Sequence, residues 1–183
     1  TTTAGTIPAA TWSSGSVCEI TGYTTAGSAT PVIGGIGQAF ANLVWNCTNQ
    51  TAPIALSSST LNGTAHIAFS VAATGSSYLA LNQAASLSSL SVTGGSLLIT
   101  STNTSRTVAL SGDLTVTGGS LALTGSSGTG TLNVTGGVSI YGGMATLSNG
   151  SGTGVLTVSG GVNLTGGTLN MNGSTGASTL NVA

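Results

Sequence analysis

A repeat of 24 residues is the feature of this sequence that most limits what it can fold into. Residues 107–130, 131–154 and 155–178 align without gaps, and a fourth block begins at Thr179. Apolar residues in each block come in pairs that are spaced by two and recur 24 positions later. The pairs are Val108/Leu110, Leu114/Val116 and Leu121/Leu123, then Leu132/Val134, Val138/Ile140 and Ala145/Leu147, then Leu156/Val158, Val162/Leu164 and Leu169/Met171. A spacing of two is strand periodicity, with both side chains on one face.

Glycine-rich corners separate the pairs, as at Gly118-Gly119 and Gly142-Gly143. Glycine allows tight turns because it adopts positive φ at little steric cost. A strand of about three residues cannot bury its apolar face alone, but stacked coils can, because each strand pairs with the next coil at roughly 4.8 Å. The sequence therefore predicts an all-β fold, a right-handed parallel β-helix (β-solenoid) with three short strands per 24-residue coil.

The residues between the apolar pairs are predicted to form outward ladders of small polar side chains. Two such columns are Thr115/Ser139/Asn163 and Ala109/Asn133/Thr157/Asn181. Asn and Thr ladders can hydrogen-bond along the axis, whereas like charges stacked at that spacing would repel. The composition agrees, because Ser and Thr supply 59 residues, lysine is absent, and the charged residues are Glu19, Arg106 and Asp113.

The repeat weakens toward the N-terminus. Residues 78–105 keep the Gly94-Gly95 corner but carry extra residues around 82–86, and residues 1–51 hold both tryptophans and both cysteines. Terminal repeats of solenoids usually diverge because they cap an open core. We predict an N-terminal cap and irregular first coil over residues 1–51, and solenoid coils over residues 52–183 that become regular from residue 107.

Cys18 and Cys47 are the two cysteines, so one disulfide is available. In an exported chain we expect this disulfide to form and to staple the first coil, whereas in a reducing compartment the two would be buried thiols. The opening sequence TTTAG is consistent with a mature N-terminus after cleavage of a leader. We therefore expect an extracellular or cell-surface protein.

The near absence of charge excludes several classes of function. One arginine cannot neutralise a run of phosphates or hold an anionic membrane surface, and no run approaches the ~18 apolar residues of a membrane span. Glu19 and Asp113 lie 94 positions apart, and His66 is the only histidine, so neither a carboxylate pair nor a Cys/His metal set is expected. We predict no catalytic, metal or cofactor site, no nucleic-acid partner, and no enzyme activity.

Eight of the twelve asparagines begin an N-x-S/T sequon, which makes each a candidate for glycosylation in an exported chain. A Thr-rich ladder sequence also generates such triplets, so both interpretations stay open. The eight are Asn46, Asn49, Asn62, Asn103, Asn133, Asn149, Asn163 and Asn172.

Two kinds of segment carry a family resemblance. ATWSSGSVCEITG (residues 10–22) and GQAFANLVWNCTNQT (residues 37–51), with the LxVxGG-type coils from Leu114 onward, resemble secreted β-solenoid repeat proteins of the adhesin or autotransporter-passenger type, as in Bacteroidota surface proteins. The resemblance implies export and a role in surface adhesion or matrix structure. The chain is shorter than such proteins and shows no sorting domain, so it is either a subunit or part of a longer protein.

Three functions are compatible with these features. The first is a structural subunit of an extracellular filament or surface matrix, which would self-assemble head to tail because the coil that begins at Thr179 leaves an open edge. The second is a fragment of a longer bacterial adhesin whose repeats continue. The third is an ice- or polysaccharide-binding module, in which surface glycans or ordered water meet the Thr/Asn ladders.

Overall fold

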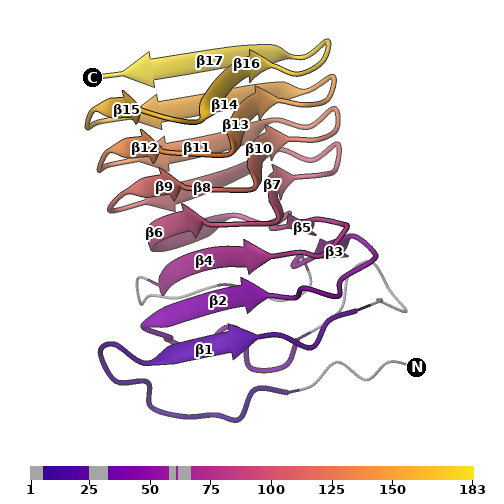
Figure 1. The fold of residues 1–183 in the computed structure, drawn as a ribbon, viewed down its shortest axis with the longest axis vertical. Coiled ribbons are helices and arrows are strands. Elements are labelled where there is room, and N and C mark those ends of the chain that lie inside the picture. Colours follow the sequence, from indigo (N-terminus) through magenta and orange to yellow (C-terminus); the bar gives the residue numbers. More distant parts are fainter. Residues whose placement is uncertain (1–5, 25–32, 58–60, 62–66) are drawn as a thin grey trace.

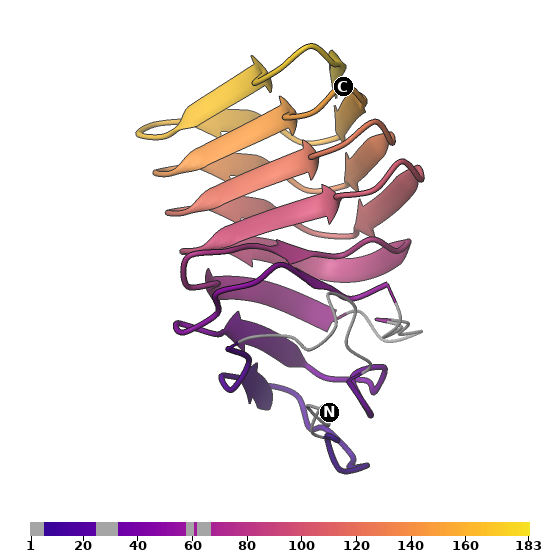
Figure 2. The ribbon, with the colours of Figure 1, turned by 90° about the vertical axis from the view of Figure 1, so that its right-hand side faces the viewer.

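A computed structural model describes residues 6–24, 33–57, 61 and 67–183 (Figure 1). Over these residues it contains strands and no helix, and the paired strands are parallel. The coils lie one above the other from the N-terminal to the C-terminal end, as the side view in Figure 2 also shows. The predicted all-β, parallel β-solenoid with three short strands per coil is confirmed.

Each regular coil has three sides, which we number in chain order. Side 1 carries β8 (Arg106–Leu110), β11 (Gly130–Val134), β14 (Thr153–Val158) and β17 (Ala177–Val182). Side 2 carries β9 (Leu114–Val116), β12 (Val138–Ile140) and β15 (Val162–Leu164). Side 3 carries β7 (Ser96–Thr100), β10 (Ser120–Thr124), β13 (Met144–Ser148) and β16 (Thr168–Asn172).

The strand register confirms the 24-residue repeat. Leu132 of β11 pairs with Val108 below it and Leu156 above it, each 24 positions away. The apolar pairs point inward and form one continuous core through the stack. Because identical positions lie above one another, each coil buries the apolar face of its neighbour.

The irregular part of the chain continues the same stack. β6 (Ala85–Val92) spans two sides, since its first residues pair with β8 and its last with β9. Below it, side 2 continues through β4 (Ile67–Ala73), β2 (Asn42–Asn46) and β1 (Val17–Ile20), and side 3 through β5 (Leu79–Ala80) and β3 (Ile54–Ala55). β2 lies before the predicted boundary at residue 51 and β4 lies after it, and the two strands pair. The N-terminal region and the coils therefore share one sheet.

Two corner glycines show why the repeat needs this residue. Gly119 and Gly143 have φ of +64° and +68°, and a Cβ on Gly143 would lie 2.5 Å from the carbonyl oxygen of Gly119. Both the left-handed backbone and the close approach of the neighbouring coil exclude a larger side chain.

The outer face of side 3 differs from the expectation of an exposed polar ladder. Ala122 and Thr146 are 7% and 3% exposed, and Thr124 and Ser148 are fully buried. The turn after each side 3 strand folds back over Thr124 and Ser148, and Ala122 packs with Ala55, Ala80 and Leu98 in a second, smaller apolar cluster. The Oγ1 of Thr124 donates to the carbonyl oxygen of Gly128 at 2.9 Å, and the Oγ of Ser148 repeats this bond to Gly152 at 2.9 Å. A buried hydroxyl therefore fastens the same turn in successive coils.

Candidate functional site at the two ends of the solenoid

The last coil exposes side chains that the rest of the stack buries. Leu164, Met171 and Val182 are 51%, 38% and 52% exposed. The residues one coil earlier in the same columns are at most 1% exposed: Ile140, Leu147 and Val158. The difference arises because the described residues place no further layer above these columns.

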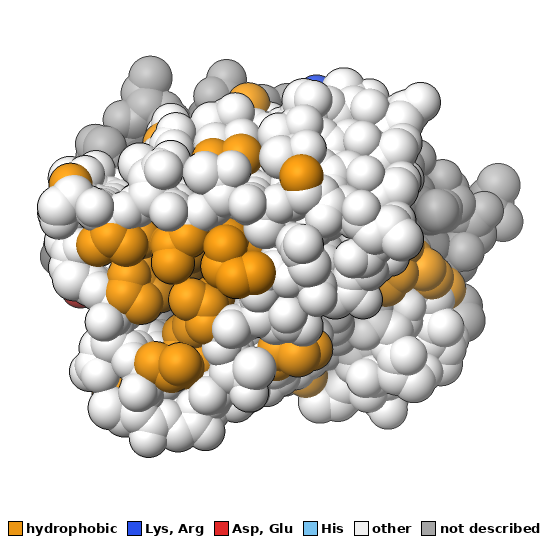
Figure 3. Space-filling view, turned by 90° about the horizontal axis from the view of Figure 1, so that it is seen from above, with side chains coloured by type: hydrophobic (Ala, Val, Ile, Leu, Met, Phe, Trp, Pro, Cys, Tyr) orange, Lys and Arg blue, Asp and Glu red, His pale blue; other side chains and the backbone are white. Residues whose placement is uncertain are grey.

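Backbone groups are open at the same place. β17, β16 and β15 each pair with a strand on one side alone. An unpaired parallel edge presents N–H and C=O groups that can accept another strand. We call the free edges of β15, β16 and β17, with Leu164, Met171 and Val182, the C-terminal face. Figure 3, which looks down on this end, shows apolar side chains gathered between polar rims.

The N-terminal end is closed by comparison. Ile36 and Phe40 are 2% and 1% exposed although they belong to the first coil. Trp12 packs edge-on against Phe40, with ring centroids 4.8 Å apart. Large side chains from the irregular sequence thus cover the end of the core, as expected for a solenoid cap.

Residues 6–12, which we call the strap, run beneath this first coil. Thr6 forms an isolated parallel bridge with Gly34, and the backbone N–H of Ile7 donates to the Gly34 carbonyl oxygen at 2.8 Å. Ile7 and Trp12 are half-buried against the core. The strap therefore acts as a partial extra layer at this end.

The side-chain amide of Gln38 makes several further hydrogen bonds that hold the strap. Its Oε1 accepts hydrogen bonds from the Ala10 backbone N–H at 2.8 Å and from the Trp12 indole N–H at 3.2 Å. Its Nε2 donates to the carbonyl oxygens of Pro8 at 3.1 Å and Gly35 at 2.9 Å. The sequence alone did not indicate this role, because Gln38 lies outside the repeat and no periodic column marks it.

β1 provides a free strand edge at the N-terminal end. It pairs with β2 on one side and lies at the end of its sheet. The register continues from β1 through β2, β4, the second half of β6, β9 and β12 to β15. β1 and β15 are therefore the two ends of one parallel column, side 2.

The predicted Cys18–Cys47 disulfide is wrong. Both cysteines are free and buried. The register places Cys18 opposite Leu43, so Cys47 lies four residues further along, which is about 13 Å of extended chain. A disulfide needs Cα atoms within about 7 Å of each other. Instead, the Cys47 thiol donates to the carbonyl oxygen of Ile20 at 3.3 Å.

The two thiols are also poor nucleophiles. Burial raises the pKa of Cys18 above its ordinary value. Burial also raises the pKa of Cys47, and a hydrogen bond from the Tyr23 backbone offsets part of that rise. Because the thiolate is the reactive form, both side chains behave as core residues.

The charged residues serve the corners and edges of the fold. The carboxylate of Asp113 accepts a hydrogen bond from the Gly137 backbone N–H at 2.8 Å, and Glu19 accepts one from the Asn46 side-chain amide at 2.7 Å. Four strand steps separate β1 from β9, which places the two carboxylates on the order of 19 Å apart. Among the described residues no group of three metal-ligating side chains exists, and His66 lies outside those residues.

The candidate glycosylation sites fall at different depths on the surface. Asn46 is half-buried and hydrogen-bonded to Glu19. Asn62 lies outside the described residues. The other six are exposed: Asn49, Asn103, Asn133, Asn149, Asn163 and Asn172. Glycosylation of these residues stays a prediction.

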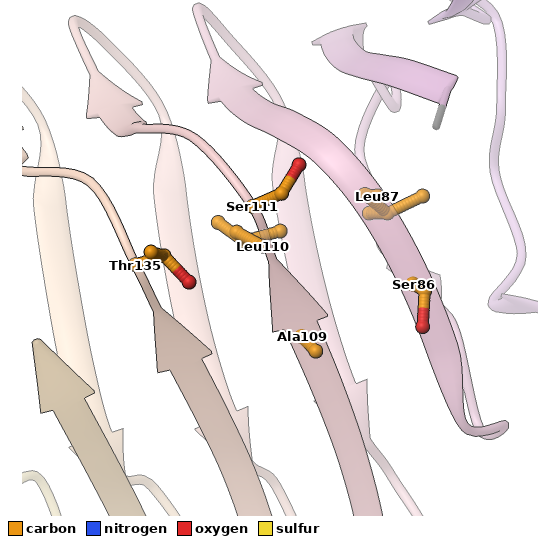
Figure 4. Close-up of a pocket in the computed structure, with 6 residues that line it drawn as sticks. All are labelled: Ser86, Leu87, Ala109, Leu110, Ser111 and Thr135. Carbon is orange, nitrogen blue, oxygen red and sulfur yellow. The ribbon is translucent and has the colours of Figure 1, made fainter. Parts of the chain in front are cut away.

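A small hollow lies where β6 divides between sides 1 and 2. Ser86, Leu87, Ala109, Leu110, Ser111 and Thr135 line it (Figure 4). These residues supply hydroxyls and aliphatic carbon, and none of them is a titratable acid or base.

No helix of the described structure is long and apolar enough to cross a membrane. Comparison of the chain with family models, with curated proteins and with solved structures finds no match.

Proposed function

We propose that this chain is a structural subunit of an extracellular filament or surface matrix, in which copies join end to end by continuing the solenoid stack. One observation carries the proposal: β1 and β15 are the opposite free ends of the same parallel column. All strands of this column run in the same direction. Another copy can therefore extend the column without reversing any strand.

The column register specifies the joint. Glu19 belongs to the outward column that runs through Thr115 and Ser139 to Asn163, so β1 of one copy places Glu19 beside Asn163 of the next. The same pairing sets Ile20 over Leu164, which is 51% exposed in the single chain. The two contacting surfaces differ from each other, so the contact is heterologous and generates an open filament.

The energetics favour association. The half-exposed side chains of the C-terminal face, Leu164, Met171 and Val182, each contribute on the order of 1 kcal/mol when covered. The free backbone groups of β15 gain partners from β1 at the same time. A net charge of −1 adds almost no repulsion between copies.

The location outside the cell is part of the same proposal. A surface of Ser, Thr and Asn with one arginine and no lysine suits a fibre that has to resist trypsin-like proteases. With the disulfide absent, its robustness has to come from stacked backbone hydrogen bonds and the apolar columns.

Cryo-electron microscopy of the purified, undenatured protein tests the proposal, with a paired-cysteine variant as a probe of register. Long fibres with a layer spacing near ~4.8 Å that continues through the junctions are expected. Glu19→Cys combined with Asn163→Cys should yield disulfide-linked ladders on a non-reducing gel. Glu19→Cys combined with Asn133→Cys is the matched control, because Asn133 is exposed on side 1 away from either end.

A chain that stays monomeric at high concentration, with no cross-linked ladder, would overturn the filament proposal. That outcome would favour the alternative in which the chain is a fragment of a longer adhesin and further coils cover the C-terminal face. An ice- or polysaccharide-binding module has weaker support, because the outward column of side 1 mixes Ala109, Asn133, Thr157 and Asn181.

A further inference from the structure

The order of segments along the chain relates the strap to side 1 of the stack. In the regular coils a side 1 strand directly precedes its side 2 strand: β14 ends at Val158 and β15 begins at Val162. In the first coil the segment 33–36 also precedes β2, although only Gly34 is bridged there and residues 35–37 form a turn. The strap precedes β1, and the Thr6–Gly34 bridge places it on the outer edge of segment 33–36 in the parallel sense.

In the proposed assembly, β17 of a second copy lies at the position that the strap occupies in the single chain. β17 extends side 1 one layer beyond β14, and no side 2 strand follows it in the described chain. When β1 of another copy pairs with β15, it follows β17 around the stack as β15 follows β14. Segment 33–36 of that copy is then the next side 1 layer, and its outer edge meets β17.

We infer that the strap and β17 of a second copy compete for one seat, the outer edge of residues 33–36, so that the strap keeps the N-terminal end closed until β17 displaces it. This inference rests on the proposed end-to-end assembly. It adds a control step, because the N-terminal end cannot accept a neighbour while its own strap is docked.

The seat is shaped for a closely approaching extended segment. A Cβ on Gly34 would lie 2.8 Å from the Thr6 Oγ1, and one on Gly35, whose φ is +77°, would lie 2.2 Å from the Ile7 carbonyl oxygen. The absence of side chains at both positions lets the backbone of another strand lie against this edge.

The strap is held less firmly than β17 holds a neighbour. Its strand pairing consists of one isolated bridge, and Thr6, Pro8 and Ala10 are exposed. β17 pairs with β14 in register over six residues, from Ala177 to Val182. The seat offers β17 the same single bridge at Gly34, because residues 35–37 form a turn. Exchange in favour of β17 is therefore driven by the pairing of β1 with β15, which forms in the same joint.

A reversible covalent lock tests the inference. In the variant with Thr6→Cys and Gly34→Cys, the new Cβ at position 34 lies 3.2 Å from the Cβ of residue 6, close to the ~3.5–4.5 Å of a disulfide. The oxidised variant should not form fibres, and reduction should restore assembly. Thr6→Cys alone is the matched control and should assemble under both conditions.

A second variant works in the opposite direction and does not depend on folding of the locked chain. Gln38→Ala removes the amide that holds Pro8, Ala10 and Trp12, so the strap should leave more often and fibres should grow about tenfold faster. Asn49→Ala, at an exposed position, is the control and should leave the growth rate unchanged.

The outcomes separate this inference from the proposed function. If the wild-type chain forms no fibres, end-to-end assembly itself fails. If the wild-type chain assembles and the oxidised double-cysteine variant grows at the same rate, assembly stands and competition by the strap is wrong. Fibres of Gln38→Ala that grow no faster than the wild type would also overturn the inference, because loosening the strap would then not free the N-terminal end.

Discussion

The two ends of this solenoid differ in how the apolar core is covered. At the N-terminal end, Trp12, Ile36 and Phe40 come from irregular sequence and cover the core. At the C-terminal end the repeat stays regular through β17, and the residues that would be core in any other coil are half-exposed. The comparison teaches that, in a stack of identical layers, burial is a property of the neighbouring layer rather than of the residue.

The test with the largest expected effect on stability places the same substitution in the middle and at the end of the stack. Val134→Asp puts an unpaired carboxylate into a column that is 2% exposed, and should cost about 5 kcal/mol or more of unfolding free energy. Val182→Asp, at a position 52% exposed, should cost less than about 1 kcal/mol. Urea unfolding followed by circular dichroism measures both. Equal costs would show that the last coil is as buried as the middle ones in solution.

The corners should show the same dependence on a neighbour. Gly143→Ala introduces a Cβ at positive φ, 2.5 Å from a carbonyl oxygen of the coil below, and should cost about 2–3 kcal/mol. Gly161→Ala meets no atom within 4 Å and should change stability by less than about 0.5 kcal/mol. Thermal denaturation of the two variants side by side distinguishes them. A large effect of Gly161→Ala would indicate that another layer covers that corner.

The buried Ser148 hydroxyl on side 3 allows the same comparison between a middle coil and the last coil, with a smaller expected change in unfolding free energy. Ser148→Ala removes the donor to the Gly152 carbonyl oxygen and should cost about 1–2 kcal/mol. Asn172→Ala, in the same column of the last coil, loses only an exposed hydrogen bond that its amide oxygen accepts from the Ser178 hydroxyl, and should cost less than about 0.5 kcal/mol. Unfolding free energies in urea decide between these values. If Ser148→Ala is neutral, the hydroxyl does not fasten the turn.

The smallest effect concerns pH and the closed end. Burial raises the pKa of Cys18 and Cys47 in the folded chain above the ordinary 9.0. A group with a raised folded pKa contributes stability that is fully present below pH 9.0 and is lost as the pH rises through the folded pKa. Stability should therefore fall above about pH 9, and less so in Cys47→Ala. Unfolding free energies measured between pH 7 and 11 check this, and an unchanged slope in the variant would contradict it.

The coils could be predicted from the sequence because their information is local and repeated. Leu132, Val138 and Leu147 are inward because the period of two fixes their face and the period of 24 fixes their neighbours. The outer face of side 3 was missed because strand alternation does not describe a turn that folds back over Thr124. The recurrence of a hydroxyl at 124 and 148, each before a glycine-rich turn, was the available signal.

The N-terminal end could not be predicted in the same way. The predicted disulfide was wrong because paired residues of β1 and β2 are 25 positions apart, as Cys18 and Leu43 are. This offset could not be read from the sequence, because the two irregular strands do not belong to a repeating column of apolar residues. The hold of Gln38 on the strap depends on four backbone and side-chain groups between residues 8 and 35, which only the folded chain brings together.

The constant register of the coils also has a kinetic consequence. Each regular coil joins residues 24 apart, as Leu132 with Val108 and Leu156 with Leu132, so every new coil closes a loop of the same length. The entropy of loop closure depends on that length and not on how many coils already exist. Growth of the folded stack is therefore a sequence of equivalent steps, each templated by the layer before it, and folding time should increase in proportion to the number of coils rather than steeply with chain length.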